Sequence, residues 1–223
     1  MVTIDREAAP AVGVAALPAL LAALSGRARI GAGLLVLPIA VAAFFRDPDR
    51  APDRVEPGPD VVVAPADGKV MAAGPGQPGV APEGQWQQVS IFLSAFDVHI
   101  NRAPYAGRLT EVTYRPGRWL AAYKHESAHL NERTDLTVVQ EVDGATRTVV
   151  FRQIVGLMAR RVVTRVEAGD TVRAGQRIGL MKFGSRMDVF VPLDAVVQVR
   201  KGDRVVAGES VLARWPITAR VTP

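Results

Sequence analysis

A glycine followed by a serine, Gly184-Ser185, is a dipeptide through which this chain could do covalent chemistry on itself. Serine is a weak nucleophile at neutral pH and needs a base and an activated carbonyl. The Gly184 carbonyl is always within reach of the Ser185 hydroxyl, and glycine has no side chain to obstruct the attack. In a strained turn the attack would convert the amide to an ester. β-Elimination and hydrolysis would then leave a pyruvoyl group. Gly-Ser is also a common turn sequence, so the dipeptide alone leaves both interpretations open.

An internal repeat surrounds this dipeptide. Residues 166–178 recur as residues 199–211, and each copy reads as strand, Gly-Asp turn, short strand, Ala-Gly turn, strand. Two such units facing each other predict a flattened β-sandwich that resembles the hammerhead of biotinyl and lipoyl carrier domains. Those domains present a modifiable lysine between the two halves, and Lys182 stands near that place. A carrier domain modified at Lys182 is therefore the alternative function, although Phe183-Gly184-Ser185 replaces the second methionine that biotin ligation usually requires.

The rest of the chain after residue 60 is also rich in predicted strands. Short apolar stretches at 61–63, 89–93, 136–142 and 148–151 are separated by Gly, Pro and Asp-Gly turns. Asp143-Gly144 is a strong hairpin signal. Residues 119–132 form the one later segment that reads as a helix or long loop. We therefore predict a mainly β (α+β) catalytic domain over residues 61–223.

The N-terminal part differs in composition. Residues 8–24 and 30–45 carry no charge, and Arg27 and Arg29 lie between them. Each run is at or just below the short end of a membrane-spanning helix, about 17–25 residues. Residues 1–45 are therefore predicted to form a hydrophobic helical hairpin that anchors the chain in a membrane, followed by an exposed linker over residues 46–60. A signal peptide, which would need a basic start, and a buried soluble hairpin are the alternatives.

Composition limits the chemistry that the chain can perform. The sequence has no cysteine and three histidines, which excludes disulfides and thiolate chemistry and argues against a metal site. The net charge is +5, so the partner is expected to be acidic. None of the 13 aromatic residues interleaves with the basic cluster at Arg160, Arg161 and Arg165, as nucleic-acid binding would require, and we predict no nucleic-acid partner.

Several motifs occur in the order found in one enzyme family. Residues 179–192 (GLMKFGSRMDVFVP) resemble the processing site of phosphatidylserine decarboxylase proenzymes, in the short branch that carries Phe-Gly-Ser-Arg. The other matching blocks are 44–48 (FFRDP), 64–70 (APADGKV), 97–104 (DVHINRAP), 131–133 (NER), 153–156 (QIVG) and 159–161 (ARR).

The resemblance implies an autocatalytic precursor. Cleavage between Gly184 and Ser185 would give a β chain, residues 1–184, and an α chain, residues 185–223, that remain associated as a heterodimer. The former Ser185 would become a covalent pyruvoyl cofactor. The amine of phosphatidylserine would form a Schiff base with it, lose CO2 and leave as phosphatidylethanolamine. No metal is implied.

The resemblance also implies roles for two side chains. His99 would take the Ser185 proton as general base and later serve as an acid, and Asp67 would orient His99. Longer family members carry a second histidine at the position of Arg102, so His99 would serve both steps or another group would replace it. His125 and His129 are possible substitutes, although two histidines four residues apart are also common on an exposed face.

The basic balance fits an anionic lipid. Arg160 and Arg161, within a cationic stretch that includes Arg147, Arg152 and Arg165, are the candidate lipid-binding residues. A solvated strand face is the alternative interpretation. We expect phosphatidylserine and an anionic membrane as partners, and a location on the cell membrane at the cytoplasmic face.

Overall fold

A computed structural model describes residues 2–50, 57–158, 161–182 and 184–216. The chain forms two units, which divide between Asp49 and Arg50. Of the linker predicted over residues 46–60, the first three residues form a strand, and residues 51–56 lie outside the described part.

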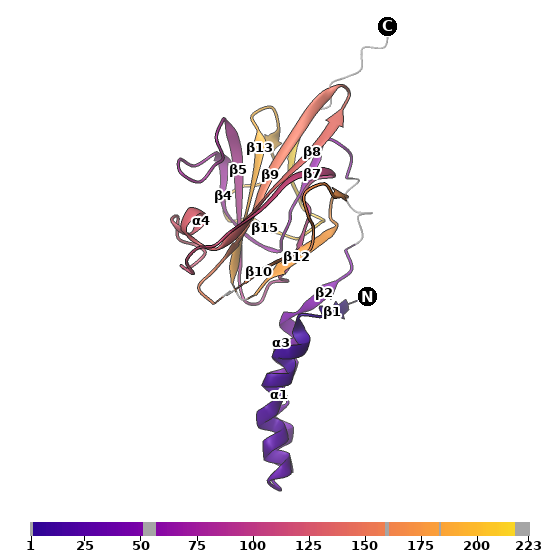
Figure 1. The fold of residues 1–223 in the computed structure, drawn as a ribbon, viewed down its shortest axis with the longest axis vertical. Coiled ribbons are helices and arrows are strands. Elements are labelled where there is room, and N and C mark those ends of the chain that lie inside the picture. The colour runs from indigo at the N-terminus through magenta and orange to yellow at the C-terminus, as the bar shows by residue number, and fades with distance from the viewer. Residues whose placement is uncertain (1, 51–56, 159–160, 183, 217–223) are drawn as a thin grey trace. The chain divides into compact units, whose positions relative to one another are not determined.

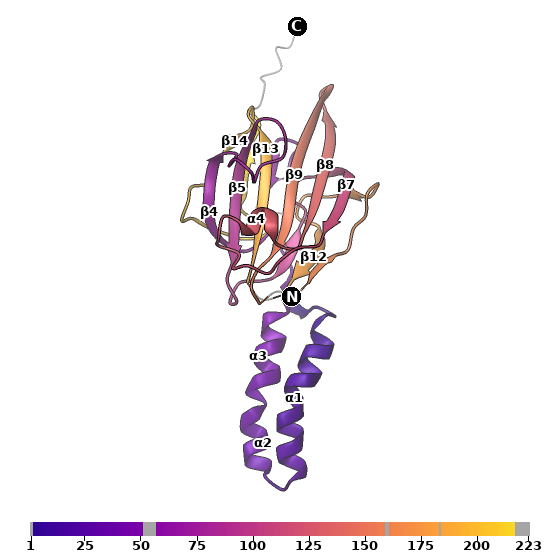
Figure 2. The ribbon, with the colours of Figure 1, turned by 60° about the vertical axis from the view of Figure 1, so that its left-hand side comes forward.

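The N-terminal unit is a helical hairpin closed by two short strands. Helix α1 (Ala8–Leu24) packs against α2 (Ala28–Leu34) and α3 (Val36–Phe44), as Figure 2 shows, and β1 (Val2–Ile4) pairs with β2 (Arg46–Pro48). The break between α2 and α3 has a local cause, because Pro38 has no N–H to donate to the Leu34 carbonyl. Gly31 allows the helices to approach closely, since a Cβ there would lie 2.8 Å from the Ala19 carbonyl oxygen.

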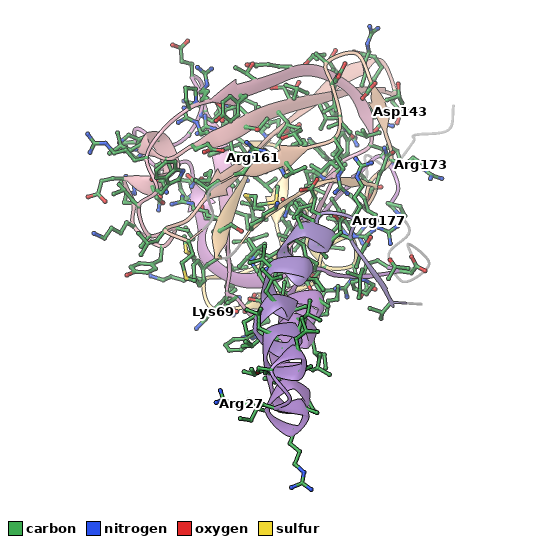
Figure 3. All side chains as sticks on the ribbon, turned by 60° about the horizontal axis from the view of Figure 1, so that its bottom comes forward. Arg27, Lys69, Asp143, Arg161, Arg173 and Arg177 are labelled. Carbon is green, nitrogen blue, oxygen red and sulfur yellow. The ribbon has the colours of Figure 1, made fainter. Side chains whose placement is uncertain are left out.

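The surface of this hairpin is strongly apolar. Among the described residues, no helix is long and apolar enough to cross a membrane. The large apolar side chains exposed on the three helices and at the junction of α2 and α3 are Val14, Leu17, Leu20, Leu21, Leu24, Ile30, Leu35, Val36, Leu37 and Ile39. Arg27 lies in the turn that joins α1 to α2 (Figure 3).

The second unit is mainly β, as the sequence predicts, with a curled sheet of eight described strands (Figure 1). Its strand order is β11-β7-β8-β9-β13-β5-β4-β15. The bounds are β11 (Thr171–Val172), β7 (Gly107–Arg115), β8 (Arg133–Val142), β9 (Ala145–Val155), β13 (Ser185–Pro192), β5 (Trp86–Leu93), β4 (Gly68–Pro75) and β15 (Arg204–Val205).

Two smaller sheets complete the unit. One has the order β10-β12-β6 and the other the order β14-β16-β3. Their bounds are β10 (Val162–Thr164), β12 (Arg177–Met181), β6 (Ile100–Arg102), β14 (Val196–Val197), β16 (Val211–Arg214) and β3 (Val61–Val63). The short helix α4 (Ser127–Leu130) is the helical part of the 119–132 segment.

The sequence repeat is visible as a structural repeat. The first copy places β11 and the second places β15 at opposite ends of the large sheet. Equivalent glycines have nearly equal left-handed φ angles, 101° at Gly169 and 103° at Gly202, then 78° at Gly175 and 73° at Gly208. The two Ala-Gly turns meet, because a Cβ on Gly175 would lie 3.6 Å from the Gly208 Cα.

Strand β13 occupies the interior of the large sheet. It pairs antiparallel with β5 along Ser185–Pro192 and with β9 along Ser185–Phe190. Its side chains from Ser185 to Val191 are all buried. The first residue of this central strand is therefore Ser185, bonded to the sheet on both sides.

Candidate active site

The Gly184-Ser185 peptide bond lies at the end of the connection between β12 and β13, where β13 begins. Gly184 has a φ of +66°, a left-handed conformation that glycine adopts without steric cost. Ser185 pairs with Leu93 on one side and with Val155 on the other. The peptide bond is thus held between a left-handed turn residue and a fixed strand residue. Phe183 lies outside the described residues.

The imidazole of His99 contacts the backbone N–H of Gly184, in the peptide group immediately before this bond. The Gly184 N–H donates to His99 Nε2 at 3.2 Å, and His99 Nδ1 lies 2.9 Å from the Asp97 carbonyl oxygen. A carbonyl oxygen can only accept, so Nδ1 carries the proton and the Nε2 lone pair accepts the Gly184 N–H. His99 is 2 % exposed. The arrangement presents a neutral imidazole whose basic nitrogen faces the Gly184 backbone.

The Ser185 hydroxyl is buried beside this base. Its side chain is 0 % exposed, and Oγ has no hydrogen-bond partner. An unpaired buried hydroxyl typically costs about 1–3 kcal/mol. Catalytic hydrogen bonds often form only as the reaction begins, so the absence of an Oγ–Nε2 bond in the precursor is compatible with base catalysis.

Gly156 packs against the carbonyl that Ser185 would attack. A Cβ on Gly156 would lie 2.0 Å from the Gly184 carbonyl oxygen, and 3.2 Å from the Ala122 Cβ. Real Cβ atoms do not approach an oxygen so closely, so only glycine fits here without moving the carbonyl. Gly156 belongs to one of the family motifs, but the sequence alone assigns it no role. The spacing of residues does not show that this glycine packs against the Gly184 carbonyl.

Asp97 holds the loop that carries His99. Its carboxylate accepts from the Ser94 N–H at 2.8 Å and from Ser94 Oγ at 2.6 Å, and Arg204 Nη1 lies 3.2 Å from it. These bonds fix the turn from which the Asp97 carbonyl reaches the imidazole. The Asp-x-His spacing is the only sequence signal for this role of Asp97, and it was not used to predict the role.

Asp67 is placed with an arginine in this structure. Its carboxylate bonds Arg50 Nη2 at 2.7 Å and accepts from the Ala207 N–H at 2.8 Å. Burial raises the pKa of Asp67 above its ordinary value, while the bonds to Ala207 and Arg50 oppose that rise. The structure brings His99, Gly184 and Ser185 together, but it pairs the His99 ring with Asp97 and not with Asp67.

Arg102 stands where longer members of the family carry a second histidine. Arg102 is 5 % exposed, and its Nη1 donates to the Gly175 carbonyl at 2.9 Å. It makes no bond to the Ser185 hydroxyl. His125 and His129 are exposed, on the 119–132 segment. In the described part of the chain, no group of three histidine, aspartate or glutamate residues could hold a metal ion.

Asn131 fastens the 119–132 segment near the site. Its buried side chain accepts from the Leu120 N–H at 2.9 Å and donates to the carbonyls of Leu120 and Val155, both at 2.8 Å. Val155 is the strand partner of Ser185. The segment that supplies Ala122 is therefore tied to the strand beside Ser185.

A buried ion pair anchors the start of β13. Arg186 Nε donates to Asp188 at 2.7 Å, and these side chains are 2 % and 0 % exposed. Arg186 Nη2 also donates to Ser90 Oγ on β5 at 3.1 Å. Removing one partner of a buried pair typically costs about 3–5 kcal/mol. The residue that follows Ser185 is thus firmly held.

A cavity of about 630 Å³ lies beside the same strands. Its apolar wall includes Phe92, the β5 residue next to the partner of Ser185, and Tyr123, whose ring packs edge-on against Phe92 at 6.3 Å. Lys69 and Lys201 also line it, and Lys69 is labelled in Figure 3. Apolar walls with two ammonium groups suit an amphiphilic anion.

The predicted lipid-binding arginines are only partly described. Arg161 is exposed, immediately before β10, and is labelled in Figure 3. Arg160 lies outside the described residues.

Comparison with known proteins decides the family. Residues 37–213 match the family model of phosphatidylserine decarboxylase. The chain belongs to the phosphatidylserine decarboxylase family. It is 46% identical to the phosphatidylserine decarboxylase proenzyme of Symbiobacterium thermophilum over 213 residues, covering 96% of both chains. It is 45% identical to that of Solibacter usitatus over 201 residues, covering 88% of this chain and 91% of the relative.

Membership of this family confirms the resemblance drawn from the motifs. The relatives match along most of the chain, including the β unit that the carrier interpretation would leave without a purpose. The alternative of a carrier domain modified at Lys182 therefore has no support beyond the repeat.

Adding a methyl group at Gly156 is expected to prevent self-cleavage. In Gly156→Ala the Cβ would overlap the Gly184 carbonyl oxygen and displace it. We expect processing to slow on the order of a hundredfold or more, as for loss of precise reactant placement. Electrophoresis of freshly translated chain measures the rate. Gly13→Ala, with no neighbour within 4 Å, is the matched control, and equal processing of both variants would contradict the assignment.

Self-cleavage should also depend on pH through Asp67. Because burial raises the pKa of this carboxyl, its ionised form is lost at a higher pH than that of an exposed aspartate. If ionised Asp67 supports cleavage, the rate falls as pH is lowered through that raised pKa, and Asp67→Asn is slow throughout. The measurement is the pH profile of cleavage after cell-free translation. Asp60→Asn, which removes a partly exposed ion pair with Arg214, is the control and should keep the wild-type pH profile. If Asp67→Asn showed the same fall in cleavage rate at low pH as the wild type, ionised Asp67 would have no role in cleavage.

Proposed function

We propose that the protein is a self-processing decarboxylase that converts phosphatidylserine to phosphatidylethanolamine and CO2. The observation that carries the proposal is the contact of His99 Nε2 with the Gly184 N–H, beside a buried and unbonded Ser185 hydroxyl. The names of the relatives support the substrate, since they are phosphatidylserine decarboxylase proenzymes.

Self-cleavage uses groups already in place. His99 Nε2 takes the Ser185 Oγ proton, Oγ bonds to the Gly184 carbonyl carbon, and the C–N bond breaks as the nitrogen gains a proton. The resulting ester then loses the Ser185 α-proton and its Cβ–O bond, which releases Gly184 as a carboxylate. Water replaces the nitrogen of the dehydroalanine, ammonia leaves, and a pyruvoyl group remains at residue 185.

The surroundings of Ser185 fit such a group. Residue 185 starts a strand, its side chain is wholly buried, and no hydrogen bond to Oγ must be broken before reaction. A pyruvoyl carbonyl would supply the electron sink that decarboxylation of an amino acid needs. The chain itself would hold residue 185 between β5 and β9. His99 Nε2 would carry the proton that the substrate carbon takes up after CO2 leaves.

The two products of cleavage are proposed to stay together. The α chain, residues 185–223, contains β13, which pairs with β5 and β9, and β16, which pairs with β3. All three partners belong to the β chain. Cutting the peptide bond before Ser185 removes none of these ladder bonds, so a heterodimer is expected.

The substrate is proposed to bind beside the sheet edge of this site. The cavity lined by Phe92 and Tyr123 would take the apolar part of the lipid, while Lys69 and Lys201 would attract its phosphate. Arg160 and Arg161 remain candidates for contact with the anionic membrane. No nucleic-acid partner is proposed.

The helical hairpin is proposed to attach the protein to the cell membrane at its cytoplasmic face. Leucine, isoleucine and valine side chains are exposed on α1, α2 and α3, and an exposed apolar patch can mark a membrane-contact site. The turn arginines, Arg27 and Arg29, can reach lipid phosphates through their long side chains.

Removing the Ser185 hydroxyl tests the catalytic proposal. Ser185→Ala should give one uncleaved chain that releases no CO2 from phosphatidylserine, because neither the nucleophile nor the carbonyl can form. Intact mass and CO2 release are the two readouts. Ser25→Ala, in the hairpin turn, is the matched control and should cleave and react normally. Release of CO2 by Ser185→Ala would overturn the proposal.

Charges on the hairpin test the membrane proposal. Leu17→Asp with Leu21→Asp should release the full-length protein from vesicles of phosphatidylglycerol and phosphatidylcholine in flotation, because each carboxylate would have to leave water. Leu193→Asp, equally exposed but in the β unit, is the control. Flotation of the double variant with the vesicles would refute the anchoring role, whereas self-cleavage should be unaffected in both variants.

A further inference from the structure

A second cavity, of about 520 Å³, lies where the two repeat copies meet. Arginines dominate its lining, and the lining side chains that the structure describes include no carboxylate. The arginines are Arg50, Arg102, Arg173 and Arg177, and the other lining residues are Pro57, Ala106, Ala174, Gly175, Gln176 and Gly208. We call this cavity the arginine pocket. It shares no lining residue with the site formed by His99, Gly184 and Ser185.

Backbone from both repeat copies forms part of the pocket. Gly175 and Gly208 occupy equivalent places in the two copies, and their backbones are in van der Waals reach of each other. Arg102 crosses this contact, because it donates to the Gly175 carbonyl while a Cβ on Gly208 would lie 3.2 Å from the Arg102 Cδ. The pocket is therefore built on a rigid part of the fold.

One guanidinium group of the pocket, that of Arg50, is incompletely matched by the described protein groups. Arg50 Nη2 bonds Asp67, but Arg50 Nε is buried and has no partner. A buried guanidinium donor without an acceptor is costly. Arg102 is 5 % exposed, so its charge too is largely withdrawn from water. The cost at Arg50 would be offset by an anion with several acceptor oxygens.

Two further arginines extend from the same margin of the unit. Arg173 and Arg177 are exposed, flank the turn that contains Gly175, and are labelled in Figure 3. The planar fork of arginine matches the oxygens of a phosphate group and can bond two of them at once. Four such groups around one cavity favour a phosphate over a single carboxylate.

We propose that the arginine pocket binds a phosphate group, carried either by an anionic lipid or by a soluble phosphate compound. This site is additional to the decarboxylase site and does not depend on the proposed function. Arg50 both lines the pocket and pairs with Asp67.

Calorimetric titration of the full-length protein with inorganic phosphate, at physiological ionic strength, tests the proposal. Arg173→Gln with Arg177→Gln should weaken binding by at least about tenfold, since two forked donors are lost. Arg118→Gln with Arg200→Gln removes the same charge from exposed positions outside the pocket and should leave the affinity unchanged. Equal weakening by both pairs, or no effect of either, would overturn the proposal.

Vesicles identify the source of the phosphate. If the ligand is a lipid, phosphatidylcholine vesicles that contain phosphatidic acid should bind the wild-type protein more strongly than vesicles of phosphatidylcholine alone. The same vesicles should displace bound inorganic phosphate from the protein. Phosphate binding that depends on Arg173 and Arg177 without any gain from phosphatidic acid would indicate a soluble ligand. Absence of both kinds of binding in the wild type would refute the site.

A conservative pair keeps the test informative if the glutamine variant does not fold. Arg173→Lys with Arg177→Lys preserves the charge and removes only the forked donors. Retained thermal melting and self-cleavage, together with weakened phosphate binding, would support the pocket. Unchanged phosphate affinity in the lysine variant would show that general charge, and not a built site, binds the anion.

Discussion

The hydrogen bond from the Gly184 N–H to His99 Nε2 is the interaction on which the account of this protein depends. It requires the imidazole to be neutral with its proton on Nδ1, and the Asp97 carbonyl enforces that tautomer. It also places the base on Gly184, the residue whose carbonyl the Ser185 hydroxyl would attack. The Asp97 turn, the left-handed Gly184 and the close approach of Gly156 each serve to maintain this contact.

The large sheet supplies the rigidity that such a contact needs. Ser185 is bonded into the sheet on both sides, and the buried ion pair of Arg186 and Asp188 fixes the next residues of the same strand. The peptide bond at the start of this strand is therefore less able to change its conformation than a peptide bond in a loop. The same ladder would hold the new chain end in place after cleavage, so one element serves both the precursor and the product.

Much of the fold was predictable because its signals are local. The repeat, the Asp143-Gly144 hairpin and the apolar α1 each depend on residues that are adjacent in sequence. The contact of His99 with Gly184 joins positions 85 residues apart, and only the family resemblance brought them together. Gly156 and the Asp97 carbonyl could not be assigned, because they act through backbone atoms whose neighbours depend on tertiary packing. The role of Asp67 in orienting His99 stays a prediction, and the sequence did not indicate the ion pair of Asp67 with Arg50, which lies 17 residues earlier.

The intact mass of the purified wild-type protein tests the central claim most directly. The account predicts two fragments, one ending at Gly184 and one beginning at residue 185, with the second resistant to N-terminal sequencing because its amine has been replaced by a carbonyl. A single chain of 23.8 kDa with an unmodified Ser185 would contradict it.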